Sequence, residues 1–440
     1  MKSGSQWSAA ALGAVIAGLL ANSPAVRAAE LSYGVDVGVG QTDNVARVST
    51  DEQDETIASV GAQLRLDHES RRLRANVETR LEYRDYLDNT YDGEVVGNLL
   101  ANGVFAFVED RFTWTVTDTF GQTTQNQFAP STPDNRANVN YLSTGPDFTL
   151  PLGSRNKLLM HGRYIDLHYE DSDVGNQRVR GELALQRTLS DASNVSLNVT
   201  SEQTRFDDAA LVDFDNNEGF ARYEVDAART SLSLDAGVNE ITRGDETDRG
   251  WLGRLNLKRR TSTSLTVGLE LGHDFSDAGN AFADLQVNQP GSTEPVPVQQ
   301  TATPFENTYG TVYGQFSRNR TDILLRAGYY DEGYQAQPLF DRKRITLELG
   351  LNRNLNASLS AHCNANYSRQ EYDALNRKFT DLTANLGVRW SVGRSTSVSF
   401  DYSFMDRNDN ASDSDYRANE IWVRFGYQVG EGASGRFGGS

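Results

Sequence analysis

The sequence has little of what usually holds a secreted globular protein together. Cys363 is its single cysteine, so no disulfide can form within the chain. Hydrophobic residues make up 38% of the chain, below the roughly 45–50% of typical globular domains. A soluble globule of this length needs a large dry core, and the chain is short of material for one. A closed β-sheet with a wet interior can do without such a core because its backbone hydrogen bonds are complete.

Long apolar runs and helical periodicity are missing after residue 30. This absence excludes a transmembrane helix, which needs about 18 consecutive apolar residues or more. The one apolar run, AALGAVIAGLLA at 10–21, follows Lys2 and precedes small residues at Val26 and Ala28. That order is typical of a secretory signal peptide and predicts cleavage after Ala28, with an uncleaved anchor as the alternative. The mature protein is therefore expected to function outside the cytoplasm.

The sequence also has fewer basic than acidic residues, and it lacks recognisable catalytic motifs. The 42 Lys and Arg residues face 60 Asp and Glu residues, for a net charge of −18, which argues against nucleic-acid binding. The five histidines do not accompany a nucleophile in any G-x-S-x-G, H-E-x-x-H, Walker or dinucleotide motif, and no cysteines are paired for metal binding. We therefore expect no catalytic residues, no metal site and no cofactor.

The chain does have period-two alternation, seen most clearly at residues 73–87, LRANVETRLEYRDYL. Leu73 to Tyr83 form a mostly apolar face, and Arg74 to Arg84 form a charged one. Copies of about ten residues recur between turn-rich stretches, as expected of transmembrane β-strands. We count twenty copies, with eighteen as the alternative: 31–40, 58–67, 73–87, 95–107, 112–120, 137–149, 157–169, 178–187, 195–202, 219–227, 230–239, 250–258, 265–275, 308–317, 322–330, 344–352, 357–367, 382–390, 397–404 and 419–428.

The connections between these copies alternate in length. Every second one is short: 68–71, 109–111, 151–156, 189–194, 228–231, 259–264, 317–321, 352–356 and 392–396. The others are mostly longer: 41–55, 121–135, 170–177, 204–217, 241–249, 276–306, 331–341, 370–378 and 405–417. Outer-membrane barrels combine short periplasmic turns with long extracellular loops. The prediction is an all-β, antiparallel up-and-down transmembrane barrel over residues 29–430, with a signal peptide at 1–28 and a flexible tail at 431–440.

Each face of the predicted strands has its own role. Apolar residues face lipid, with a girdle of aromatics at Tyr83, Trp114, Tyr164, Tyr329, Trp390, Phe400, Tyr402, Phe425 and Tyr427. The inward face carries as many acidic as basic side chains, which predicts a neutral wall of cross-strand charge pairs. The pore-lining candidates are Arg74, Glu78, Arg80, Glu82, Arg84, Arg178, Arg180, Arg326, Arg389 and Arg424. Small inward residues such as Gly34, Gly38, Gly40 and Ser358 predict an open lumen.

Two features of the loops leave alternatives open. Long loops are rich in Asp and Glu while short turns carry Arg, which we interpret as solubility, with divalent-cation bridging to surface polysaccharide as the alternative. Residues 276–306, rich in Gln and Pro, are expected to be a simple exposed loop; a plug or gate in the lumen is the alternative.

The stretch YGVDVGVGQTDNVARV (33–48) resembles the start of the β-barrel porin 2 family of proteobacterial outer-membrane barrels. The likeness is carried by Thr42, Asp43, Asn44, Val45 and Arg47, and by the Tyr-rich YRDYLDN at 83–89. Members of that family are often associated with exopolysaccharide biosynthesis or the PEP-CTERM/exosortase system. The resemblance implies a role in surface polysaccharide export or envelope organisation and provides no catalytic residues.

The combined expectation is a passive or gated channel for exopolysaccharide export across the outer membrane of a Gram-negative cell. A general diffusion porin and a non-transporting, glycan-binding surface barrel are the alternatives. The expected partners are outer-membrane lipid and lipopolysaccharide, exopolysaccharide and periplasmic export components, with the oligomeric state left open. Nucleic acid is not an expected partner.

Overall fold

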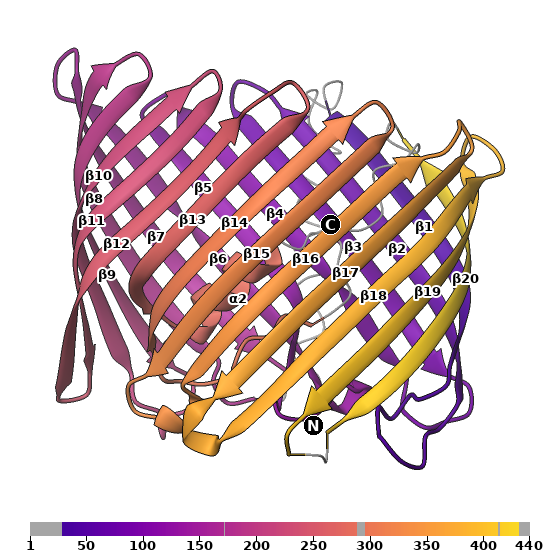
Figure 1. The fold of residues 1–440 in the computed structure, drawn as a ribbon. Coiled ribbons are helices and arrows are strands. Elements are labelled where there is room, and N and C mark those ends of the chain that lie inside the picture. The colour runs from indigo at the N-terminus through magenta and orange to yellow at the C-terminus, as the bar shows by residue number, and fades with distance from the viewer. Residues whose placement is uncertain (1–28, 171, 288–294, 412–413, 431–440) are drawn as a thin grey trace.

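Residues 29–430, except 171, 288–294 and 412–413, are described by a computed structural model (Figure 1). In it, twenty antiparallel strands form one sheet that closes where β1 pairs with β20. The strands are β1 Ala29–Thr42, β2 Glu55–Glu69, β3 Leu73–Tyr86, β4 Glu94–Val108, β5 Phe112–Thr124, β6 Arg136–Pro151, β7 Asn156–Tyr169, β8 Asn176–Ser190, β9 Ser193–Phe206, β10 Phe214–Ala227, β11 Thr230–Arg243, β12 Glu246–Arg260, β13 Leu265–Ser276, β14 Phe305–Arg318, β15 Thr321–Tyr334, β16 Arg342–Asn354, β17 Leu359–Tyr372, β18 Arg377–Ser391, β19 Thr396–Asp409 and β20 Tyr416–Val429. The predicted fold class is confirmed.

Within the described residues, four short helices accompany the barrel: η2 Pro133–Asn135, α2 Ala278–Val287, η3 Pro338–Phe340 and η4 Asp373–Leu375. The expectation of no helix after residue 30 is therefore wrong at α2, whose sequence has only a weak helical pattern. In the part of the chain that the structure describes, no helix is both long and apolar enough to cross a membrane. The predicted signal peptide and C-terminal tail lie outside the described residues.

All twenty predicted strands are present, but most extend beyond the predicted ten or so residues and run from 12 to 16 residues. β9 shows why. Its outward residues are apolar at Val195, Leu197 and Val199 and then polar at Ser201 and Gln203. Alternating hydrophobicity marks only the part of each strand that faces lipid. The strands continue past the apolar band at their extracellular ends, where hydrogen bonding to neighbouring strands is sufficient to extend them.

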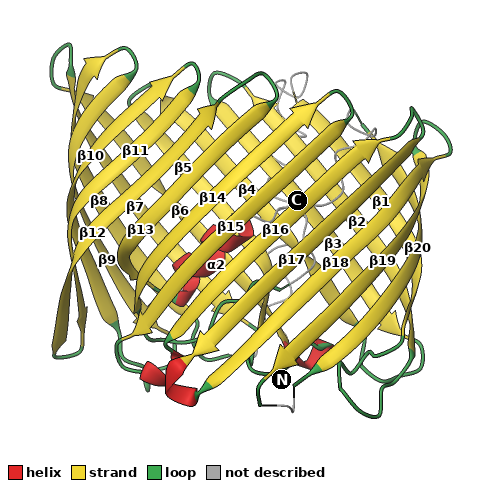
Figure 2. Ribbon diagram, viewed as in Figure 1, coloured by secondary structure: helices red, strands yellow, loops and turns green. Residues whose placement is uncertain are grey.

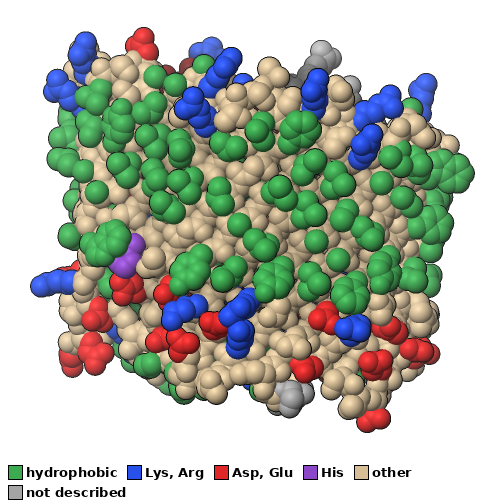
Figure 3. Space-filling model, in the orientation of Figure 1, with side chains coloured by type: hydrophobic (Ala, Val, Ile, Leu, Met, Phe, Trp, Pro, Cys, Tyr) green, Lys and Arg blue, Asp and Glu red, His purple; other side chains and the backbone are tan. Residues whose placement is uncertain are grey.

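An apolar belt crosses the face of the barrel that Figure 3 shows. All nine predicted girdle aromatics are exposed on it, from Tyr402 at 38% to Trp390 and Phe425 at 52%. Leu197 and Val199, at 64% and 62%, are among its most exposed aliphatic side chains. Exposed side chains of this kind, on a sheet without free edges, suit hydrocarbon as the surrounding solvent. The protein is a multi-pass β-barrel of the outer membrane.

The two ends of the barrel differ, as the loop lengths predict. One end has short turns and the other has longer loops (Figure 1). On the face shown in Figure 3, Lys and Arg line the rim with the short turns, and most of the Asp and Glu lie toward the end with the longer loops. By analogy with outer-membrane barrels the short turns are periplasmic.

One predicted long loop, 241–249, is wrong: β11 and β12 continue to a two-residue turn, Gly244–Asp245, where Gly244 has a φ of 59°. Glycine reaches this left-handed conformation without the strain that other residues incur.

The small inward residues do not produce the open space expected of them. A Cβ on Gly40 would lie 2.5 Å from the Trp422 ring, and one on Gly38 would lie 2.8 Å from the Arg424 side chain. Gly34 faces Gln63 in the same way, while Ser358 lies in a turn and not on a strand. These glycines make room for large neighbours on the adjacent strand, so they do not show that the lumen is wide.

The lipid-facing belt gives a direct prediction for stability. Leu197→Arg places a charge in the middle of the apolar part of β9 and is expected to lower the free energy of unfolding by about 2–4 kcal/mol. Leu189→Arg, on an exposed residue beside the periplasmic end of β8, is the matched control, with a cost of about 0–1 kcal/mol. Urea unfolding in phospholipid vesicles measures both values. Equal costs at the two positions would contradict the placement of the belt.

Candidate functional site: the barrel lumen and its inward segments

Four of the ten pore-lining candidates gather on the wall formed by β18–β20 and β1–β3. Glu82, only 1% exposed, lies at their centre and accepts hydrogen bonds from Arg84 Nε at 2.8 Å and Arg80 Nη2 at 3.2 Å. Arg424 approaches the same carboxylate at 3.7 Å and Asp401 at 3.4 Å. A single buried carboxylate therefore holds three guanidinium groups that project from two strands on either side of the β1–β20 closure.

Trp422 binds this network together, and the sequence analysis missed it. Its ring lies flat over Gly40, with the guanidinium carbon of Arg424 4.1 Å and that of Arg84 5.6 Å from the ring centroid. The indole Nε1 donates to Glu420. Cation–π contacts of this kind strengthen when the groups are shielded from water. The alternation did mark Trp422 as inward, but the search was confined to charged residues.

The other candidates are more scattered. Arg389 donates to Ser397 at 3.0 Å, and Arg326 lies 3.6 Å from Glu348 on the next strand. Glu78 lies 3.9 Å from Arg65, and Arg74 is exposed near the periplasmic end of β3. Arg178 and Arg180 both reach Glu202, at 3.2 and 3.8 Å. Charge pairing across neighbouring strands thus recurs around the wall, although the role of these residues in conduction stays a prediction.

Between β13 and β14, residues 277–287 and 295–304, here together called the inner segment, fold into the barrel. The expectation of an exposed loop is wrong. Helix α2 lies inside the lumen (Figure 2), and Phe282 is fully buried. Phe282 belongs to a hydrophobic cluster with residues of both the wall and the inner segment: Val139, Leu167, Tyr169, Ala278, Val296 and Val298. Burying this apolar surface in a wet barrel favours docking of the segment on the wall by the hydrophobic effect.

A buried ion pair fixes the start of the inner segment. Arg178 of β8 binds Asp277 through two hydrogen bonds of 2.7 and 2.9 Å and also binds Glu202 at 3.2 Å. The Asp277 carboxylate accepts the backbone N–H groups of Gly279 and Asn280 as well, so it caps α2. Burial opposes ionisation of Asp277, but Arg178 and these amides outweigh it and hold its pKa below the usual range. The ion pair therefore persists at neutral pH.

The inner segment touches opposite walls farther along the chain. Thr123 of β5 donates from its hydroxyl to the carbonyls of Val296 and Val298, both at 3.0 Å. On β16, Arg342 donates to the Pro297 carbonyl at 3.2 Å. Because β5 and β16 lie about half-way round the barrel from each other, residues 295–304 cross the extracellular mouth of the lumen.

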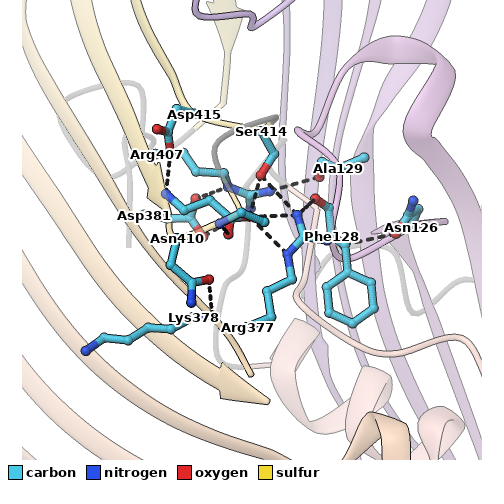
Figure 4. Close-up of polar contacts among 12 residues, drawn as sticks. Asn126, Phe128, Ala129, Arg377, Lys378, Asp381, Arg407, Asn410, Ser414 and Asp415 are labelled. Atoms are coloured by element: carbon cyan, nitrogen blue, oxygen red, sulfur yellow. Dashed lines mark hydrogen bonds and ion pairs between the residues drawn. The ribbon is translucent and has the colours of Figure 1, made fainter. Parts of the chain in front are cut away.

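A second crossing is made by residues 125–135, between β5 and β6, here called the mouth strap. On the far wall Arg377 donates to the Phe128 carbonyl at 2.9 Å, and Arg407 donates to the Ala129 carbonyl at 3.0 Å (Figure 4). The Phe128 ring also packs against Tyr372, with centroids 4.7 Å apart. Because these hydrogen bonds run from arginine side chains to main-chain carbonyls, they fix the position of the strap's backbone largely independently of the strap's own side chains. The mouth is thus spanned twice.

Sequence reasoning could have found the inner segment from one signal. Residues 276–306 are mostly polar, yet they contain Phe282 and the apolar pair Val296 and Val298 on either side of a proline. Large apolar side chains spaced this closely are not expected in a loop that is exposed to water. The partners Asp277, Arg377 and Arg407 could not have been found, because their contacts join residues far apart in the chain.

Titratable groups elsewhere in the lumen are also paired. His161 lies 2.6 Å from Asp147, and His362 lies 3.2 Å from Asp401. Among the described residues, no three His, Cys, Asp or Glu side chains are placed to share a metal ion. The expectations of no metal, no cofactor and no catalysis stay predictions.

Comparison with known proteins shows no family for this chain. No family model matches the sequence, and no curated protein matches it either. Solved structures with a similar fold include the siderophore receptor PirA from Acinetobacter baumannii, at a TM-score of 0.47 and 8% identity over 91% of this chain and 80% of that chain. A mutant of the ferric enterobactin receptor PfeA from Pseudomonas aeruginosa gives 0.46 and 8% over the same shares.

A loop-deletion form of OmpT, an outer membrane protein of Vibrio cholerae, gives a TM-score of 0.34 and 10% identity over 91% of this chain and 100% of that chain. These values are too low to carry the neighbours' activities over to this chain. The molecule's own geometry defines it as an outer-membrane barrel with a charge-paired lumen and two segments crossing its extracellular mouth.

Proposed function

We propose that the protein is a passive channel for neutral, hydroxyl-rich solutes, narrowed at its extracellular end by the inner segment and the mouth strap. The observation that carries the proposal is a closed barrel whose inward arginines and carboxylates neutralise one another. On the best-paired wall, the three arginines Arg80, Arg84 and Arg424 contact the three carboxylates Glu82, Asp36 and Asp401. A wall selective for polyanions would carry an excess of cationic side chains. A balanced wall offers hydrogen bonds without a strong preference for either sign of charge.

Export of exopolysaccharide is the finer form of this proposal. It is supported by the resemblance of residues 33–48 to barrels associated with polysaccharide biosynthesis, and it agrees with a lumen suited to uncharged sugars. Under this proposal, the two crossing segments restrict the mouth so that large molecules do not diffuse through freely. Such a restriction would keep small solutes in the periplasm while an extended polysaccharide chain leaves the cell.

Planar bilayers test the channel directly. Purified protein is expected to produce stepwise conductance, with weak ion selectivity because the wall charges are paired. Liposome swelling with sugars of graded size then separates the candidates, since a general diffusion porin passes all sugars below a size limit. A membrane that stays sealed at high protein occupancy would refute the channel and favour a structural or glycan-binding barrel.

A further inference from the structure

A recess opens to solvent at the extracellular mouth, beside the wall of β1–β3 and β18–β20. Four of the five residues that carry the sequence resemblance contribute to it: Thr42, Asn44, Val45 and Arg47. Arg84 and Glu420 rise into it from the charge network on the wall below.

The loop that forms one side of the recess is rigidly held. Asn44, only 1% exposed, donates to the carbonyls of Val48 at 2.6 Å and Arg417 at 2.9 Å. Asp43 accepts from the backbone N–H of Asn419 at 2.7 Å and from its side-chain amide at 2.6 Å. These bonds fasten the loop onto β20 before any ligand arrives. A preformed site binds without the entropic cost of ordering a loop.

The walls of the recess combine apolar faces with paired charges. Val45, Ile57 and Tyr86 line the recess, and they pack with Trp422, which lies behind the lining, in one buried cluster. The charged groups have counterparts close by: Arg84 with Glu82 at 2.8 Å, Arg136 with Glu94 at 2.6 Å, and Glu420 with the Trp422 indole. Glu82 and Glu94 lie behind the lining of the recess, and Arg47 and Glu420 add one charge of each sign to it. The recess therefore presents N–H donors and a carboxylate acceptor side by side, and its charges balance once these two buried carboxylates are counted.

This chemistry matches a sugar better than an ion. Each sugar hydroxyl both donates and accepts a hydrogen bond, and a pyranose also has apolar C–H faces that suit aromatic surfaces. An anion would meet Glu420 and a cation would meet Arg47 and Arg84. We propose that the recess is a binding site for neutral saccharide units at the extracellular mouth of the channel. The proposal rests on the proposed function in taking this saccharide to be the solute that passes.

Equilibrium binding to the detergent-solubilised full chain tests the site separately from conduction. The probes are maltotriose and isomaltotriose as neutral ligands and trigalacturonate as the acidic comparator. Trp422 reports occupancy by fluorescence, because Trp114, Trp251 and Trp390 are exposed on the lipid belt. We expect saturable binding of a neutral trisaccharide, with a signal that disappears in Trp422→Phe.

Two substitutions then locate the site. Glu420→Gln and Arg47→Ala are expected to weaken neutral binding about tenfold, the effect of losing roughly 1.4 kcal/mol of hydrogen bonding. Asp248→Asn, an exposed extracellular carboxylate on β12, is the matched control and leaves binding unaltered. Thermal unfolding confirms that each variant is folded, and calorimetry repeats the measurement without relying on fluorescence.

The outcomes separate the two proposals. Absence of saturable binding, preference for trigalacturonate, or binding unaffected by both substitutions would overturn the saccharide site even if the protein conducts. Saturable binding with the expected variant effects would uphold the site even if bilayers stay sealed, and the proposed channel alone would then fail.

Discussion

Replacing the inner segment with a tight turn is expected to raise single-channel conductance by on the order of threefold or more, since a twenty-stranded barrel without an obstruction is wider than open porins. The structure makes the deletion feasible because Ser276 and Phe305 are register partners on β13 and β14. An Asn-Gly pair in place of 277–304 would close that hairpin as a type I′ turn. Planar-bilayer recordings of the variant and the parent protein measure the change.

The control is a loop that does not enter the lumen. Residues 207–213, between β9 and β10, are largely exposed, and their replacement by a short Gly-Ser turn is expected to leave conductance unchanged. Liposome swelling is expected to show a higher size limit for sugars in the inner-segment variant only. An unchanged conductance in that variant, with normal barrel folding, would mean that the inner segment does not limit passage.

Breaking the ion pair between Arg178 and Asp277 is expected to release the start of the inner segment. Arg178→Met leaves Asp277, 9% exposed, without its cation, and leaves Glu202, 5% exposed, with only Arg180 at 3.8 Å. Removing one partner of a buried ion pair costs about 3–5 kcal/mol. That cost falls on the docking of α2 rather than on the barrel, whose strand pairing does not involve the pair. We expect frequent transitions to a higher conductance level and faster amide hydrogen exchange within α2.

Three comparisons distinguish the ion pair from general damage. Arg180→Met removes a half-exposed arginine 3.8 Å from the same Glu202 and is expected to have little effect. The double variant Arg178→Met with Asp277→Leu replaces both charges by apolar groups and should recover much of the docking, as buried pairs often allow. Stable conductance in Arg178→Met, equal to that of Arg180→Met, would show that the pair does not hold the segment.

The same ion pair predicts the effect of acid. Because the pKa of Asp277 is lowered in the folded protein, its contribution to docking is present above the pKa of an ordinary aspartate, about 3.9, and is lost as the pH falls through the lower folded value. Docking of α2 through this pair is thus expected to be constant from neutral pH down to about pH 4 and to weaken below it. Conductance recorded across this range measures the change.

The sequence alone determined the barrel. Side-chain alternation, loop sorting and a shortage of core residues identified all twenty strands, because lipid imposes the same pattern on every strand that crosses it. It also placed the nine girdle aromatics on the lipid face, where exposure is a property of one strand and its neighbours. Strand lengths were underestimated, since beyond the membrane the outward face of a strand such as β9 is polar and the pattern fades.

Only the tertiary structure decided what fills the barrel. Arg178 and Asp277 are far apart in sequence, as are Arg377 and Phe128, and these contacts exist only because closure brings distant strands around one lumen. The side-chain pattern along a strand depends on whether each residue faces lipid or water, so this pattern was enough to predict the outer surface of the protein. The inside depends on which side chains meet across the lumen, and no local pattern records that.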